Sequence, residues 1–162
     1  MTWRGSTTVS DRIFASLVYL LPLLDVVGFV GRILMMTDSF ISPLVSLVAT
    51  PLAPLLAIYT GFIPLIVFFA LFLLVVRNEN IPHFIRFNTM QAILFGIVLS
   101  LIAIVWQYAL EPIFGMGLLT QTLFNAVFLG TIAAVGYSIV QTALGRYAEI
   151  PTISDAVYMQ VR

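Results

Sequence analysis

The amino-acid sequence predicts an all-α integral membrane protein, a single membrane domain over residues 1–162 built as a bundle of four transmembrane helices. Hydrophobic residues make up 61% of the chain and charged residues 9%, and the mean hydropathy is +1.11. Soluble domains carry roughly 25% charged and about 45–50% apolar residues. A small folded domain still exposes much of its surface and cannot hide this excess, so lipid is the solvent that fits. The placement of long apolar runs and of arginine supports the same prediction.

The first predicted span covers residues 13–34. Ser10 and Asp11 precede it as N-cap candidates, and a Gly-Arg pair marks its end. Pro22 and Asp25 interrupt it. The short polar stretch before this span has the pattern of neither a cleavable signal peptide nor a transit peptide, so we expect insertion without processing.

The second span follows a stretch without any charge, residues 39–76. At helical rise this stretch would be about 57 Å long, nearly twice the thickness of the hydrocarbon core, so it cannot be one straight helix. We therefore predict an interfacial or re-entrant segment over residues 39–50 and a span over residues 56–76. Three prolines are expected to break the first half, the last two acting as a hinge: Pro43, Pro51 and Pro54.

The third span is predicted over residues 87–110, after a polar loop at residues 77–83, and is expected to end at Glu111-Pro112. The fourth span is predicted over residues 119–144. A polar tail, residues 148–162, then leaves the membrane. In this tail a short helix capped by Ser154-Asp155 would place Ile153, Val157 and Tyr158 on one apolar face. We expect this face to dock on the bundle or on a partner, the alternative being a mobile tail.

Arginine positions predict the orientation. With four spans, both termini and the middle loop share one side, and that side holds six of the seven basic residues: Arg4, Arg12, Arg77, Arg86, Arg146 and Arg162. The other side holds Arg32. This bias places the N- and C-termini on the cytoplasmic side.

Small residues recur at every fourth position in the last two spans, which predicts smooth faces for close helix packing. The candidate packing face consists of two such runs: Ala92, Gly96 and Ser100 in the third span, and Ala126, Gly130, Ala134 and Ser138 in the fourth. We expect the two spans to pack on each other or on copies of themselves.

Asp25 is the carboxylate that falls within a span, about 18 Å from its start at helical rise. A charge at that depth is costly and usually faces a cavity or a partner. Two interpretations stand side by side: Asp25 is a polar lining or proton-sensitive group, or a bend at Pro22 brings it to the outer interface near Arg32.

Further candidates for a polar lining or for partner contacts are Arg86, Asn88, Gln91 and Asn125. Amides in lipid form hydrogen bonds across helices, so most are expected to hold helices together. Asn88 and Gln91 lie three residues apart beyond Arg86 and predict a polar face at one end of the third span, either a vestibule or a docking surface.

Other kinds of site have little support in the sequence. The chain has no cysteine, and a single histidine, His83, is a poor metal site. We find no nucleophilic triad pattern or glycine-rich phosphate loop, and therefore predict no catalytic, cofactor or metal site. The net charge is zero, and without a basic stripe a nucleic-acid partner is not expected.

Three polar segments in order resemble the Tic20 family, the small four-helix membrane subunits of the translocon at the inner chloroplast envelope and their cyanobacterial relatives. They are residues 11–25 (DRIFASLVYLLPLLD), 86–94 (RFNTMQAIL) and 148–160 (AEIPTISDAVYMQ). The similarity runs from about residue 11 to the end of the chain.

This resemblance implies a protein-conducting or channel-associated role in preprotein import, with both termini in the stroma or the cytoplasm. It implies the lipid bilayer, other translocon subunits and preproteins as partners, with self-assembly into a homo-oligomer as a further expectation. The membrane would be the plastid inner envelope or a cyanobacterial plasma or thylakoid membrane. A small ion or solute channel using Asp25 and a membrane scaffold are the alternatives.

Overall fold

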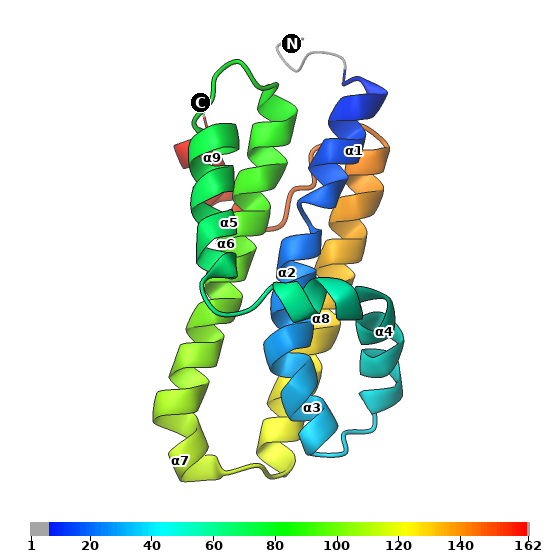
Figure 1. The fold of residues 1–162 in the computed structure, drawn as a ribbon, viewed down its shortest axis with the longest axis vertical. Helices are drawn as coiled ribbons and strands as arrows, with labels where there is room; N and C mark the ends of the chain where they lie inside the picture. Colours follow the sequence, from blue (N-terminus) through cyan, green and yellow to red (C-terminus); the bar gives the residue numbers. More distant parts are fainter. Residues whose placement is uncertain (1–6, 162) are drawn as a thin grey trace.

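All secondary structure in residues 7–161, the part of the chain that the computed structural model describes, is helical (Figure 1). Three helices are long and apolar enough to cross a membrane: Val9–Met36, His83–Phe114 and Leu118–Ala143. A fourth crossing is present if the bent pair Ser42–Ile58 and Ile63–Val76 forms one span. The all-helical prediction is confirmed.

The first helix begins earlier than the sequence indicated. Thr8 is its N-cap, and a capping box pairs Thr8 with Asp11, whose backbone N–H lies 3.2 Å from Thr8 Oγ1. The helix is irregular just before Pro22, because proline cannot donate a hydrogen bond to the carbonyl four residues back. Its segments are α1 (Val9–Leu17), α2 (Leu20–Asp25), the π-helical η1 (Val26–Gly31) and α3 (Arg32–Met36).

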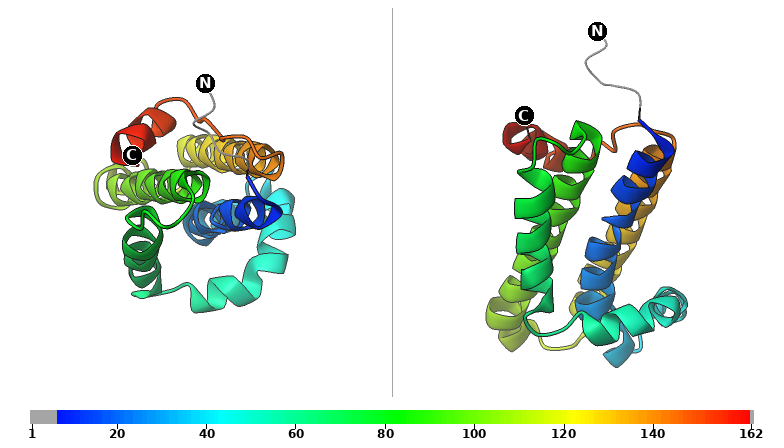
Figure 2. Two further views of the ribbon diagram at one scale, coloured as in Figure 1. Left: turned by 90° about the horizontal axis from the view of Figure 1, so that it is seen from above. Right: turned by 45° about the horizontal axis from the view of Figure 1, so that its top comes forward.

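The second helical region is bent by 90° between α4 (Ser42–Ile58) and α5 (Ile63–Leu71), which continues into the π-helical η2 (Phe72–Val76). The hinge predicted at Pro51 and Pro54 is wrong, since both prolines lie inside α4. Each proline removes only one intrahelical hydrogen bond, and membrane helices tolerate that loss. In Figure 2, α4 wraps around the outside of the bundle before α5 rises beside α6.

The third helix runs from His83 to Phe114 as α6 (His83–Val105), the π-helical η3 (Trp106–Leu110) and α7 (Glu111–Phe114). It continues through Glu111-Pro112, where the sequence predicted an end. The wider turn of η3 precedes Pro112 and relieves the clash of a proline ring with the preceding turn. The fourth long helix is α8 (Leu118–Ala143).

The first helix holds the bundle together. α6 packs on α1 and α2, and α8 packs on α1, η1 and α3. The third long helix also touches α8 directly, since the ring centroids of Trp106 and Phe124 lie 4.9 Å apart. The two long helices therefore touch each other, and the predicted packing through their small-residue faces, on each other or on copies of themselves, stays a prediction. Periodicity identifies a smooth helix face but not its neighbour: Ala92 of α6 packs in a cluster with Tyr19 of the first helix, whereas Ala126 and Gly130 of α8 are exposed.

The tail docks on the bundle, as predicted. The short helix α9 (Ile153–Gln160) packs on α6 (Figure 2). Val157 is fully buried there, and the ring centroids of Tyr158 and Phe87 lie 4.8 Å apart. The helix begins after Thr152 rather than at a Ser154-Asp155 cap, since Ser154 Oγ donates back to the Ile150 carbonyl.

The bundle has two distinct ends (Figure 1). The terminal end holds the start of α1, the turn at residues 77–82, the end of α8 and α9. The distal end holds the turns at residues 37–41 and 115–117. Four described arginines belong to segments of the terminal end and Arg32 to α3 near the distal end, while Arg4 and Arg162 lie outside the described residues.

The outer surface is apolar along the helices. Phe62 and Leu118 are 80% and 81% exposed, and α5 has no buried residue at all. Such a surface is unfavourable in water and is expected where lipid is the solvent.

Candidate functional site

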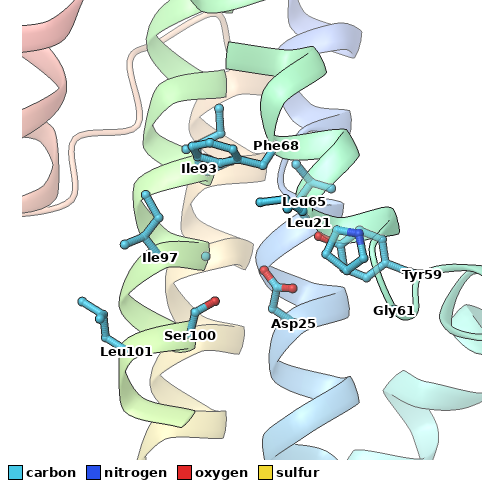
Figure 3. A pocket seen from close by; sticks show the side chains of 13 residues that line it. Leu21, Asp25, Tyr59, Gly61, Leu65, Phe68, Ile93, Ile97, Ser100 and Leu101 are labelled. Carbon is cyan, nitrogen blue, oxygen red and sulfur yellow. The ribbon is translucent and has the colours of Figure 1, made fainter. Parts of the chain in front are cut away.

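A cavity of about 420 Å³ lies between α2, α5 and α6, beside the bend of the second helical region (Figure 3). Its polar lining consists of Asp25, Tyr59 and Ser100, and the other lining residues are apolar or glycine. At one end of the cavity Phe68 and Leu71 of α5 pack against the core cluster that α6 and η2 share, while Leu65 and Pro64 line the open space nearer the bend.

Asp25 ends α2 and is half-buried. At helical rise it lies about 24 Å along the first helix from Val9 and about 17 Å from Met36, so it sits well inside the apolar region. Its carboxyl and the Ser100 hydroxyl point into the cavity from facing helices (Figure 3). No cation among the described residues pairs with it, and the exposed Arg32 is not its partner. This is the cavity-facing arrangement that the first interpretation of Asp25 requires.

Gly96 of α6 makes room for this carboxylate. A Cβ atom added at Gly96 would lie 2.9 Å from Asp25 Oδ2, closer than such atoms approach in proteins. Ala92, Gly96 and Ser100, predicted as a packing face, all line the cavity. Of the three, Ala92 is fully buried and Ser100 exposed. The small residues on α6 thus border an open space next to an acid.

Tyr59 reaches the cavity because the chain breaks there. α4 ends at Ile58, Gly61 adopts a left-handed conformation with φ +59°, and Pro64 starts α5 within its first turn. Glycine favours that conformation and proline favours the first turn of a helix. The Tyr59 side chain interacts with the carboxyl of Asp25.

A second polar cluster lies toward the terminal end and is closed. Tyr19 donates to Asn88 Oδ1 over 2.8 Å and accepts from Gln91 Nε2 over 2.8 Å. Gln91 Nε2 also lies 2.5 Å from the Ala148 carbonyl oxygen, and Asn88 Nδ2 donates to the Phe84 carbonyl. The three side chains and Ala148 are buried, and Ser138 of α8 lies beside Tyr19. This cluster joins the junction of α1 and α2 to α6 and the tail.

The remaining predicted residues lie apart from both regions. Arg86 is buried and its Nε donates to the Val76 carbonyl over 2.8 Å, which ties α6 to η2. Asn125 accepts a 2.6 Å hydrogen bond from Ser39 at the distal end. On α8, Ala126 and Gly130 are exposed, Ala134 is half-buried and Ser138 is buried, so within residues 7–161 the first two positions of that run are not covered by another helix.

The cavity can attract a cation. A carboxylate beside two hydroxyls suits an ammonium, a guanidinium or a monovalent ion, because apolar walls strengthen the interaction. A single carboxylate supplies too few oxygens for a dedicated divalent-metal cage.

Sequence reasoning singled out Asp25 but missed Tyr59 and Tyr19. A signal for Tyr59 was present, since Tyr59-Thr60-Gly61 is a polar break within the charge-free stretch. Tyr19 gives no such signal, because one tyrosine in an apolar helix is equally compatible with a lipid-facing position.

Comparisons with known proteins agree with this architecture. Residues 9–157 match the family model described as chloroplast import apparatus Tic20-like. A Tic20 family protein of Synechocystis sp. is 51% identical over 154 residues, covering 94% of this chain and 93% of the relative.

More distant relatives cover similar lengths. The Tic20 family protein Ycf60 of Gracilaria tenuistipitata var. liui is 35% identical, covering 95% of this chain and 76% of its own. Protein TIC 20-v, chloroplastic, of Arabidopsis thaliana is 28% identical, covering 96% and 73%. With a family match over most of its length and apolar helices long enough to cross a bilayer, the chain is a multi-pass membrane protein that belongs to the Tic20 family.

Proposed function

We propose that the chain is a membrane subunit of a protein translocon, similar to the protein-conducting or channel-associated component of the chloroplast inner-envelope import machinery or its cyanobacterial homologue. The observation that carries the proposal is the match of residues 9–157 to a family described as chloroplast import apparatus. The membrane would be a cyanobacterial plasma or thylakoid membrane or the plastid inner envelope.

The size of the cavity argues that one copy does not conduct a polypeptide alone. An extended chain about 5 Å by 10 Å in section, crossing a hydrocarbon core about 30 Å thick, occupies roughly 1,500 Å³. The cavity offers about 420 Å³. We therefore propose that the chain acts with copies of itself or with other translocon subunits, and that the uncovered positions on α8 contribute to such contacts.

We further propose four spans, with the bent pair counted as one and the terminal end on the cytoplasmic or stromal side. The arginines of the terminal end support this orientation. Because the chain has no cysteine, single cysteines report sidedness cleanly. An impermeant maleimide added outside intact cells should label Met116→Cys at the distal end and spare Asn80→Cys at the terminal end. The reverse pattern would refute the orientation.

The function is tested by site-specific cross-linking in the intact membrane. A photo-reactive group at Leu101, in the cavity, should cross-link to an arrested precursor in transit, and mild-detergent purification should recover other membrane translocon subunits. The matched control is a group at Leu118, which is 81% exposed and lies outside the cavity. Recovery of the chain with copies of itself alone, and no precursor adduct, would contradict the proposal.

A small ion channel is the second candidate, favoured by Asp25, which lines the cavity and has no cationic partner among the described residues. Under this alternative, Asp25→Leu should abolish cation conductance in liposomes. Unchanged conductance would remove the alternative, since Asp25 is the ionisable carboxylate that lines the cavity.

A further inference from the structure

A second hollow, separate from the Asp25 cavity, lies between α1 and α8 and reaches the terminal end. Its volume is about 480 Å³ and its walls are almost entirely apolar. Val9, Ile13 and Leu17 of α1 are more than half exposed along it. Arg12 is its charged lining residue, so the groove has an apolar body and a basic end.

The Arg12 guanidinium is held in place beside Gly145 and Thr7. Gly145, at the end of α8, has φ +74°, and a Cβ atom there would lie 2.9 Å from Arg12 Nε. Arg12 Nε donates to Thr7 Oγ1 over 3.1 Å, and Nη2 lies 3.5 Å from the Thr7 carbonyl oxygen. A guanidinium has five N–H donors. Two of the five N–H donors of Arg12 are used in these bonds, so within residues 7–161 three N–H donors are left for a ligand.

The dimensions of the groove fit a lipid. From Val9 to Leu20 it extends about 17 Å at helical rise, just over half of the hydrocarbon thickness of about 30 Å. Its apolar body therefore has the length of one leaflet, with the guanidinium at the level of the headgroups. Basic pockets between transmembrane helices at the cytoplasmic side are typical sites for acidic headgroups.

We propose that the groove between α1 and α8 binds one anionic membrane lipid, with an acyl chain along α1 and the acidic headgroup on Arg12. The charged groups near Arg12 are compatible with an acidic headgroup at this position. Asp11 is engaged by the Thr8 N–H at 2.8 Å, Glu149 accepts from Tyr158, and Arg146 follows Gly145 directly. The site does not depend on the translocon role or on Asp25.

The full chain purified in mild detergent tests the proposal by native mass spectrometry. Phosphatidylglycerol and phosphatidylcholine with the same acyl chains are the probes, and glycerol phosphate tests for a free anion. We expect about fivefold higher occupancy by phosphatidylglycerol, the effect of one basic residue near an anionic headgroup. We expect no retention of glycerol phosphate. Equal occupancy by the two lipids would overturn the proposal, and this comparison needs no variant.

Two variants locate the site. Arg12→Gln should abolish the preference, whereas Arg77→Gln, an exposed arginine of the terminal end outside the groove, should preserve it. Loss of the preference in Arg77→Gln but not in Arg12→Gln would place the lipid elsewhere. Retention of glycerol phosphate as strongly as of phosphatidylglycerol would show an anion site rather than a lipid site.

Discussion

The closed polar cluster and the Asp25 cavity both involve the first and third long helices, but they differ in how their polar groups are bonded. In the closed cluster, Asn88 and Gln91 of α6 are fully buried and bonded to Tyr19 and to the tail. In the cavity, Asp25 of α2 is half-buried and has no cationic partner among the described residues. Buried polar groups that bond to each other fix a structure, whereas an unpaired charge inside an apolar region is costly and usually serves a function. Stability should therefore depend on the first region and function on the second.

The largest loss of stability is expected from a charge placed in the contact between α9 and α6. Val157 is fully buried between α9 and α6, so Val157→Asp places an uncompensated charge there and should cost about 3–5 kcal/mol or detach α9. Thermal unfolding in detergent and protease sensitivity of the tail measure this. Met159→Asp is the matched control, since Met159 lies on the same helix and is 70% exposed. Equal unfolding midpoints for the two variants would show that the tail is not part of the cooperative structure.

A smaller loss of stability is expected when a hydrogen bond of the closed polar cluster is removed. Asn88→Ala leaves the buried Tyr19 hydroxyl without its acceptor and should lower the free energy of unfolding by about 1–3 kcal/mol. Gln107→Ala, an exposed amide on the same long helix, should change it by less than about 0.5 kcal/mol. Import or conductance per folded molecule should be unchanged in both. A functional loss in Asn88→Ala without a loss of stability would reverse the assignment of the two regions.

Asp25→Asn should reduce function without reducing stability, the opposite of the result expected for Asn88→Ala. The substitution keeps the shape of the side chain and removes a charge that no cation among the described residues balances, so stability should be unchanged or rise by about 1 kcal/mol. Cation-dependent function should fall. Asp38→Asn, an exposed carboxylate at the distal end, should change neither property. A clear loss of stability in Asp25→Asn would mean that the carboxylate is structural.

The positions of the long helices could be predicted from hydropathy because lipid imposes a minimum apolar length on each span. The bend could not be located, because Pro51 and Pro54 suggested a break that the helix tolerates while Tyr59 and Gly61 made the real one. The spacing of Ala92, Gly96 and Ser100 predicted a packing face of α6, and in the structure these residues line the cavity, because a periodicity carries no information on what faces it. Asp25 was found because a charge in an apolar run is conspicuous. Its neighbour Tyr59 lies 34 residues away, and only the tertiary structure brings the two together.

The smallest predicted effect tests whether Gly96 and Asp25 form one unit. In Gly96→Ala the new Cβ would lie 2.9 Å from Asp25 Oδ2, so the carboxyl must move, and the variant should be about 0.5–1 kcal/mol less stable than Gly130→Ala. Gly130 is the matched control because nothing lies within 4 Å of a Cβ added there, and alanine is the better helix former. In an Asp25→Ala background the difference should vanish, since the atom that obstructs the methyl group is gone. If Gly96→Ala costs the same with and without the carboxylate, Gly96 serves helix packing alone, and the cavity is not shaped around the acid.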